Sequence, residues 1–459
     1  MTEERKRPTD PPTSETPTTG EGSGADLDRR SFFRAFSRDA FQAAAGVVGA
    51  ADAVRKGTSA AAVELLGLAA DPVAGAARLG ETMAPTPVWG RSPYRVDGQR
   101  VVVLDQRRLP GEIVEVTCHS GAEIATLIRE GAVSPGPVLG QLAAYAMAMA
   151  AERNIASRPF VRTSTLRGTA NALRNARPDS AAIEDALARQ HAIWQPARAT
   201  PLVGSDGHAL PEPEVADADT AEPPARDGAA IASAMRGEAD TIAFEAMAAL
   251  GALIETGLGV LPRPEDRPLE VVTIGASGPL SAGVIGTAMG VISAAVAEGR
   301  QVHAWVLEAR PGRSGTLIGA PELQAADVPV TVIADGAVGW LFRERTIDAV
   351  LVAADRIAAN GDVAAVVGTY PLTALAARHG VPVHVCALRT TIRTTVADGG
   401  HLAITVRNRR ELLPVAGTTT PDGVDAREPL NDVTPADLIT DYVTESGVLR
   451  PPFVGEDGH

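Results

Sequence analysis

The chain has 459 residues, a formal net charge of −14 and few aromatic residues. A chain of this length is expected to form two or three domains. An acidic chain without a basic block or a cluster of aromatic side chains is a poor candidate for nucleic-acid binding. Its two cysteines, Cys118 and Cys386, form no CxxC pair, which excludes a disulfide framework and a cysteine zinc site. We therefore expect a protein of the reducing cytoplasm.

The first 90 residues differ in composition from the rest. Residues 1–28 are rich in Pro, Thr, Ser, Glu and Gly, which predicts a disordered tail. Residues 29–90 carry apolar side chains at helical spacing, which predicts accessory helices that dock on the body or on a protein partner. The Arg29-Arg30 pair superficially resembles an export signal, but charged residues from Arg38 onward interrupt any apolar segment. No run is long and apolar enough to span a membrane.

Residues 91–200 are predicted to form a small sheet followed by helices. Apolar residues on both sides of Asp97-Gly98 predict a hairpin that turns at these two residues, and 113–117 is a third strand candidate. Apolar residues at helical spacing predict helices at 122–130, 140–151, 166–176 and 180–194.

Residues 201–228 contain acidic residues interleaved with prolines and show no periodicity, which predicts a solvated linker or insertion. Metal chelation by these carboxylates is the alternative, but a flexible run does not preorganise a coordination cage.

From residue 229 to 459, short apolar strands alternate with helices. This alternation is typical of βαβ units and predicts an α/β fold, in which the sheet-and-helix domain is followed by a Rossmann-like parallel-sheet domain. Thr434 and Pro435 are favourable residues at a helix N-terminus and predict a last helix. The predicted strands are 270–274, 301–307, 328–333, 349–353 and 381–386, and the predicted helices are 230–256, 282–298, 321–326, 337–343 and 372–379.

A polar cluster follows the strand predicted at 349–353. It contains Asp355, Asn360 and a second carboxylate, Asp362. Ligands bind at the carboxyl ends of strands in open parallel sheets, so this cluster is a candidate site. The alternative is structural, because many carboxylates at strand ends only cap backbone N–H groups.

A second candidate is the turn after the first predicted strand of this domain. Gly275, Ser277 and Gly278 open the next helix, where glycine lets backbone N–H groups approach an anion. The turn matches neither the G-x-G-x-x-G pattern nor the P-loop pattern. Arg310 follows the second strand and could hold a phosphate by a bidentate contact, with an interdomain ion pair as the alternative.

Taken together, several segments resemble the S-methyl-5-thioribose-1-phosphate isomerase family, which includes ribose-1,5-bisphosphate isomerases and the regulatory subunits of initiation factor 2B. The resemblance covers about residues 93–450, with the acidic stretch as an insertion. The matching segments are 104–112, the turn at 136–140 with 143–147, Arg310-Pro311, 354–362, Gly368-Thr369-Tyr370 and 432–440.

The resemblance implies a homodimer whose active site lies between the two domains. It implies conversion of a furanose 1-phosphate to the 1-phosphoketose, a step of methionine salvage, without metal or nucleotide cofactor. Asp355 matches the family's catalytic Asp, whereas Gly275 occupies the position of its catalytic Cys. Such a reaction needs one group that acts as a base on carbon and one that acts as an acid at the oxygen.

Three further positions depart from the family's substrate-contacting motifs. The chain has Ser134-Pro-Gly-Pro137, Ser314 and Ala365-Val366 where the family has Arg-Gly-Ala-Pro, Gln and Asn-Lys. Because these departures concern one ligand, they predict an altered substrate or activity. Cys386 ends the fifth strand and could replace the missing thiol, with a buried structural thiol as the alternative.

Two hypotheses remain open from the sequence. The first is a sugar isomerase in which Asp355 is the general acid and base and Arg310 and Asn360 orient the substrate. The second is a non-catalytic binding or regulatory protein that resembles the initiation-factor subunits.

Overall fold

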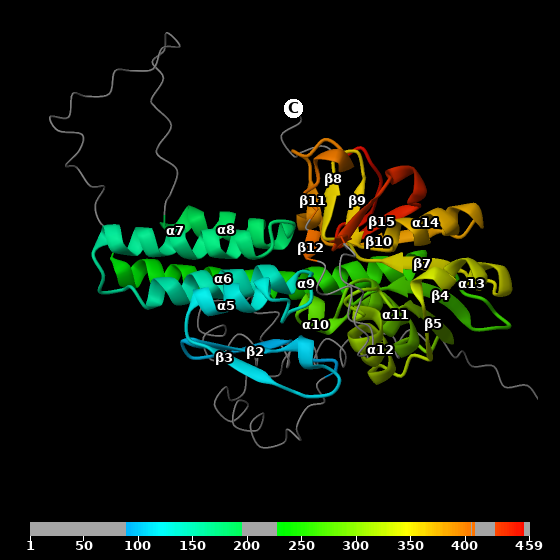
Figure 1. Cartoon of the computed structure of the whole chain (residues 1–459), viewed down its shortest axis with the longest axis horizontal. Coiled ribbons are helices and arrows are strands. Elements are labelled where there is room, and N and C mark those ends of the chain that lie inside the picture. The colour runs from blue at the N-terminus through cyan, green and yellow to red at the C-terminus, as the bar shows by residue number, and fades with distance from the viewer. Residues whose placement is uncertain (1–88, 195–226, 405, 409–426, 454–459) are drawn as a thin grey trace, which may run out of the picture.

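The computed structural model describes residues 89–194, 227–404, 406–408 and 427–453 (Figure 1). The predictions for residues 1–28, for nearly all of 29–90 and for nearly all of 201–228 lie outside the described residues.

The N-terminal sheet is a three-stranded antiparallel meander. Its strands are β1 (Tyr94–Asp97), β2 (Arg100–Leu104) and β3 (Glu115–Cys118), in the order β1-β2-β3. Gly98 has a φ of +58° in the turn of the hairpin, a backbone conformation that glycine adopts without steric cost. The predicted hairpin is therefore confirmed.

Five helices follow and form an elongated bundle, seen on the left of Figure 1. Nearly every residue of the central helix is buried. Its small side chains allow close approach: a Cβ on Gly140 would lie only 2.7 Å from the carbonyl oxygen of Ala182. The helices are α5 (Gly121–Arg129), the central α6 (Val138–Glu152), α7 (Pro159–Ala176), α8 (Ala181–Trp194) and α9 (Gly228–Val260).

The 33-residue helix α9 contributes to two hydrophobic cores, that of the helix bundle and that of the second domain. Its buried residues from Ile231 to Ala243 pack in the bundle, and those from Leu250 to Leu258 pack against the second domain. Among the described helices, α9 alone is long and apolar enough to cross a membrane by length and composition, which corrects the expectation that the chain has no such run. Its packing in two cores is that of an interior helix. The boundary predicted at residue 229 thus falls at the start of a helix that the two domains share.

The second domain contains a seven-stranded sheet, parallel except for its last strand, as predicted for the α/β class. One face is covered by α9, α11 (Ala288–Ala297) and α12 (Ala320–Ala325), and the other by α13 (Val338–Glu344) and α14 (Thr369–Arg378). In spatial order the strands are β16 (Gly447–Leu449), β15 (Asp441–Thr444), β10 (Val383–Cys386), β7 (Ala349–Val352), β4 (Leu269–Ile274), β5 (Val302–Leu307) and β6 (Val330–Ile333).

A small second sheet forms above the carboxyl ends of these strands, with the order β11-β8-β9-β14 (Figure 1). The sequence did not predict these strands, because their residues are few and polar groups interrupt them. The strands are β8 (Arg356–Ala358), β9 (Val363–Val366), β11 (Ile392–Arg393) and β14 (Asn431–Thr434); a separate pair is formed by β12 (Val406–Asn408) and β13 (Arg427–Pro429).

Two helix predictions need correction. The helix expected after Thr434 is a single 3-10 turn at Ala436–Leu438, because Pro435 has an extended backbone (ψ 143°) and the chain then enters β15. The helix expected at 282–298 begins only at Ala288, as α11, and is divided by a turn from the short α10 (Pro279–Ala282) that precedes it. The division follows from Gly283 and Gly286, whose φ angles of +106° and +100° are incompatible with a continuous right-handed helix.

Candidate active site

The turn after β4 faces two other loops of the second domain. Gly275 has a φ of +75°, and a Cβ placed on it would lie 3.2 Å from Val366 Cγ1 and 3.5 Å from Ser314 Oγ. The ends of β4 and β9 and the loop after β5 therefore meet at this glycine. The sequence analysis singled out all three positions, so the structure brings together residues that are distant in the sequence.

Asp355 is connected to this turn through β14. Val366 and Asn431 are directly opposed in the antiparallel pair of β9 and β14, so their side chains lie on the same face. Asn431 Nδ2 donates to Asp355 Oδ2 at 2.6 Å, and the backbone N–H of Asp355 donates to the carbonyl of Ala364 at 2.9 Å. The predicted catalytic carboxyl and the predicted phosphate-binding turn thus belong to one cluster.

The electrostatic environment of Asp355 favours its protonated form. Loss of hydration raises the pKa of the half-buried carboxyl, and the nearby Asp179 raises it further. Arg177, the hydrogen bond from Asn431 and Arg356 act in the opposite direction but do not cancel the rise. A carboxyl group with a raised pKa is suited to give and take protons near neutral pH.

Arg177 and Asp179 come from the connection between α7 and α8, in the other domain. They form a buried bidentate pair, with Arg177 Nε 2.9 Å from Asp179 Oδ1 and Nη2 3.0 Å from Oδ2. The sequence analysis missed this pair, because no local pattern shows that α7 ends beside β8. The only signal was an arginine and an aspartate two residues apart in a short loop.

Two arginines of the small sheet hold that connection in place. Arg356 Nη2 donates to the carbonyl of Pro178 at 2.8 Å and forms an ion pair with Glu184 at 3.1 Å. Arg393 donates to the carbonyl of Ala181. The Asp355 cluster therefore lies at the junction of the two domains.

A second set of contacts joins the domains below the Gly275 turn. Gln106 Nε2 donates to the carbonyl of Leu280, and Gln141 Nε2 donates to that of Ala282, both at 2.9 Å. Gly136 packs so closely on Ser281 that a Cβ would lie 2.4 Å from its carbonyl oxygen. The turn at 134–137 therefore lies beside the loop that carries the candidate anion site.

In the loop after β4, some polar groups stabilise the fold and others are free to bind a ligand. Ser277 Oγ accepts from the N–H of Met289 at 3.1 Å, so this buried hydroxyl caps the start of α11. Gly278 packs closely against Glu322: a Cβ placed on Gly278 would lie 2.4 Å from Glu322 Oε2. The backbone N–H groups of Ser277 and Gly278 donate to no acceptor in the described part of the chain. These N–H groups, rather than the Ser277 hydroxyl, are available to an anion.

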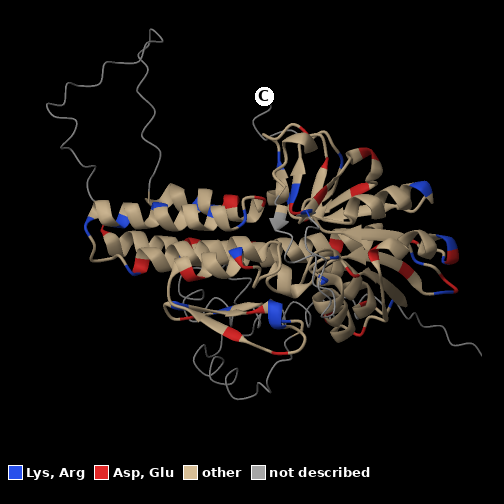
Figure 2. Cartoon of the chain, viewed as in Figure 1, with Lys and Arg blue, Asp and Glu red and all other residues tan. Residues whose placement is uncertain are grey.

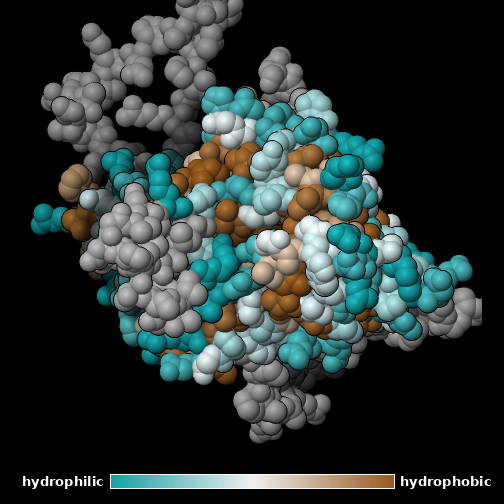
Figure 3. Space-filling view, turned by 45° about the vertical axis from the view of Figure 1, so that its right-hand side comes forward, coloured by the Kyte–Doolittle hydropathy of each residue, from teal (hydrophilic) through white to brown (hydrophobic). Residues whose placement is uncertain are grey.

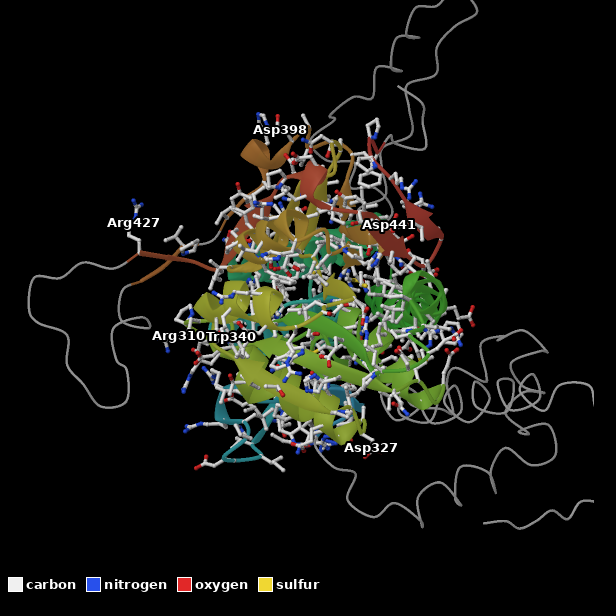
Figure 4. The ribbon with its side chains drawn as sticks, turned by 90° about the vertical axis from the view of Figure 1, so that its right-hand side faces the viewer. Arg310, Asp327, Trp340, Asp398, Arg427 and Asp441 are labelled. Atoms are coloured by element: carbon white, nitrogen blue, oxygen red, sulfur yellow. The ribbon has the colours of Figure 1, made fainter. Side chains whose placement is uncertain are left out.

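Arg310 and Asn360 have different surroundings. The backbone N–H of Arg310 donates to Asp335 Oδ2 at 2.8 Å, and its half-exposed guanidinium has no acidic partner within the described ranges. Figure 4 shows Arg310 and Trp340 on the same side of the molecule. Asn360 is exposed at the opposite end of β8 from Asp355, where its amide nitrogen donates to Asp362 Oδ2 at 2.8 Å. The structure does not bring Asn360 to the Asp355 cluster.

Both cysteines of the chain are buried in hydrophobic cores. Cys386 is fully buried in the core beneath β10, and burial raises its pKa to about 12. Cys118 is buried in the core of the bundle. The alternative interpretation of Cys386 as a buried structural thiol is confirmed. The described residues also contain no group of three or more His, Cys, Asp or Glu placed to hold a metal ion.

Comparison with known proteins gives one consistent family. A model described as the initiation factor 2 subunit family matches residues 133–451. The chain is 34% identical over 359 residues to the methylthioribose-1-phosphate isomerase of Chloroflexus aurantiacus, covering 78% of this chain and 95% of that protein.

Two solved structures share the fold over most of the chain. The 5-methylthioribose 1-phosphate isomerase of Pyrococcus horikoshii has a TM-score of 0.65 and 27% identity, covering 79% of this chain and 93% of that one. The delta subunit of translation initiation factor eIF-2B from A. fulgidus has a TM-score of 0.62 and 25% identity, with coverage of 79% and 96%.

Proposed function

The chain belongs to the initiation factor 2 subunit family, and from this premise we propose that it is an aldose–ketose isomerase of a small sugar or sugar phosphate, with Asp355 as its acid and base. The observation that carries the proposal is the environment of Asp355. Its carboxyl is half-buried at the domain junction, has a raised pKa and is held by a hydrogen bond from Asn431.

One carboxyl can serve both carbons of an aldose–ketose isomerisation. A proton leaves the carbon next to the carbonyl and a proton is added to the former carbonyl carbon, while the hydroxyl proton on the first of these carbons passes through solvent to the former carbonyl oxygen. A single carboxyl that faces both carbons removes the carbon-bound proton as the carboxylate and returns it as the carboxylic acid. Because Gly275 has no ionisable group and both cysteines are buried, we assign both transfers at carbon to Asp355 and leave the transfer between the oxygens to solvent.

The Gly275 region supports a ligand that differs from methylthioribose 1-phosphate. The side chains nearest to Gly275 are those of Val366 and Ser314, which are uncharged. A dianionic phosphate is most strongly bound by charged donors, above all by arginine. We therefore propose that the substrate has a neutral or less charged group at this position, with Arg310 as the candidate anchor for any remaining anion.

The test is a panel of sugars incubated with the purified protein in D2O and followed by NMR. The panel contains methylthioribose 1-phosphate, ribose 1-phosphate, ribose 1,5-bisphosphate and unphosphorylated methylthioribose. We expect ketose formation, or deuterium incorporation next to the carbonyl, with at least one of them. Asp355→Asn is expected to reduce the rate by about 10²–10⁴-fold, the usual contribution of a general acid or base.

The matched control is Asp398→Asn, which removes an exposed carboxylate at the outer edge of the second domain (Figure 4). It is expected to leave the rate unchanged. Turnover that survives Asp355→Asn would contradict the assigned role. Absence of both turnover and exchange with every sugar, together with measurable binding by calorimetry, would favour the non-catalytic alternative.

A cytoplasmic homodimer is the form in which we propose that the enzyme acts. The exposed apolar side chains of Val332, Trp340 and Tyr370 on β6, α13 and α14 are compatible with a subunit interface. Figure 3 shows apolar patches among polar side chains on the face turned toward the viewer. Sedimentation velocity distinguishes a dimer from a monomer.

A further inference from the structure

Asn431 is a buried amide with one hydrogen bond and one free acceptor. Its side chain is only 2% exposed, and its Nδ2 donates to Asp355 Oδ2 at 2.6 Å. Its Oδ1 is buried and has no hydrogen-bond partner within the described structure. Burying a carbonyl oxygen without a partner lowers the stability of the folded protein, so its presence here calls for an explanation.

The rest of the environment leaves Asn431 as the direct partner of the Asp355 side chain. Arg177 lies near Asp355, but its guanidinium is engaged by Asp179 through two hydrogen bonds. Arg356 is directed to Pro178 and Glu184. Within the described residues, none of these charged groups forms a hydrogen bond with the Asp355 carboxyl, whereas Asn431 does.

An amide side chain differs from an arginine or a lysine in its hydrogen-bonding groups, because it has both a donor and an acceptor. Guanidinium and ammonium groups only donate, so they stabilise a carboxylate but cannot accept a hydrogen bond from the hydroxyl of the carboxylic acid. An amide carries a donor and an acceptor that exchange places when it rotates by 180°. Its nitrogen donates to the carboxylate, and its oxygen accepts from the carboxylic acid.

We propose that Asn431 is the positioning residue of Asp355 and holds its carboxyl in both protonation states, rotating its amide as the proton arrives and leaves. This inference rests on the proposed role of Asp355 as acid and base. The proton moves from the substrate carbon to an oxygen of Asp355 and then to the adjacent carbon. Asn431 neither gains nor loses a proton. When Asp355 is protonated, Asn431 Oδ1 accepts a hydrogen bond from its carboxylic acid.

The test measures the ionisation of Asp355 directly, so it does not depend on activity. The full-length protein is labelled with ¹³C at its aspartate carboxyl carbons, and the Asp355 signal is identified by its loss in Asp355→Asn. Asn431→Leu removes the donor at similar volume and is expected to raise the pKa of Asp355 by about one unit, because the carboxylate loses its hydrogen bond. Asn431→Asp is expected to raise it at least as much, because two carboxyls then compete for one proton.

The matched control is Thr434→Val. Thr434 lies on the same strand, is 1% exposed and also carries an unpartnered oxygen, so its replacement tests the loss of any buried polar group of β14. We expect it to leave the Asp355 titration unchanged. With an active substrate, Asn431→Leu is expected to lower kcat by roughly tenfold to a hundredfold, to change KM little and to move the pH profile with the Asp355 titration.

The outcomes separate the two proposals. An Asp355 titration that does not move in Asn431→Leu or Asn431→Asp overturns the positioning role, whether or not the protein is active. The same holds if Thr434→Val moves it equally. A shifted titration in a protein that turns over no sugar supports the pairing and overturns the proposed isomerase function.

Discussion

Gly275 combines two properties that make any side chain at this position costly. Its φ of +75° is a conformation that residues with a Cβ avoid, and a Cβ would press against Val366. The turn has therefore adapted to glycine, and Val366 occupies space that a longer side chain at position 275 would need.

We predict that Gly275→Ala lowers the free energy of unfolding by about 1–2 kcal/mol from backbone strain alone. Val366→Ala should relieve the steric contact but not the strain, so the double variant should lose less stability than the sum of the single variants. Urea unfolding of the three variants measures the difference. Gly168→Ala is the control, because its Cβ would meet nothing within 4 Å, and it should be neutral or slightly stabilising. Equal losses at positions 275 and 168 would contradict the prediction.

The short helix α12 supports the loop after β4 through one carboxyl group. Glu322 is 3% exposed, and its Oε1 accepts from the N–H of Leu280 at 2.7 Å. Its Oε2 has no partner in the described structure, and burial raises the pKa of the group from 4.5 to about 8. At neutral pH the loop therefore rests on a carboxylic acid rather than on a carboxylate.

This raised pKa makes stability depend on pH in a defined direction. Between pH 4.5 and about pH 8, folded Glu322 keeps a proton that the unfolded chain has released. Its contribution is therefore most favourable below pH 4.5 and is lost as pH rises through this window, by about 1.4 kcal/mol per pH unit. Glu322→Gln keeps an uncharged acceptor for Leu280 and should remove this slope.

Urea unfolding at about pH 5.5 and pH 7.5 provides the measurement. Relative to Glu322→Gln, the wild type should lose roughly 2–3 kcal/mol between the two conditions. A difference between the proteins that is the same at both pH values would show that Glu322 ionises normally.

At the scale of the molecule, hydrogen bonds join the two domains at defined points. Charged residues lie mostly on the outer faces of the helices and at loops (Figure 2). At the lower junction, Gln141 donates to Ala282 and accepts from the Tyr94 hydroxyl at 2.9 Å, and all three residues are buried. One amide therefore connects β1, α6 and the loop after β4.

We predict that Gln141→Leu loosens this junction. It leaves the Tyr94 hydroxyl and the Ala282 carbonyl buried without partners, at a cost of about 1–3 kcal/mol for each group. Amide hydrogen exchange should accelerate in the loop 278–283. Gln190→Leu is the matched control, since Gln190 is equally buried and donates to Met235 inside the bundle. It should lower stability without a selective effect on that loop, and equal exchange in both variants would contradict a junction role for Gln141.

The sequence by itself determined the class of fold, five of the seven strands of the large sheet and the position of Asp355 after β7. These features depend on local periodicity and on a run of residues with a strong family resemblance, and both are readable along the chain. Gly275 was also identifiable, because it lies in a turn between a strand and a helix.

The tertiary structure alone decided which residues surround Asp355. Arg177 and Asn431 lie far from it in the sequence, and each belongs to a segment whose local pattern indicates no site. The small sheet that carries Asn431 was missed, and Pro435 was assigned to a helix, because their conformations depend on pairing with distant strands. Local propensity predicts what a segment can form alone. The buried contacts of Asp355 exist only after two domains and two sheets have packed around it.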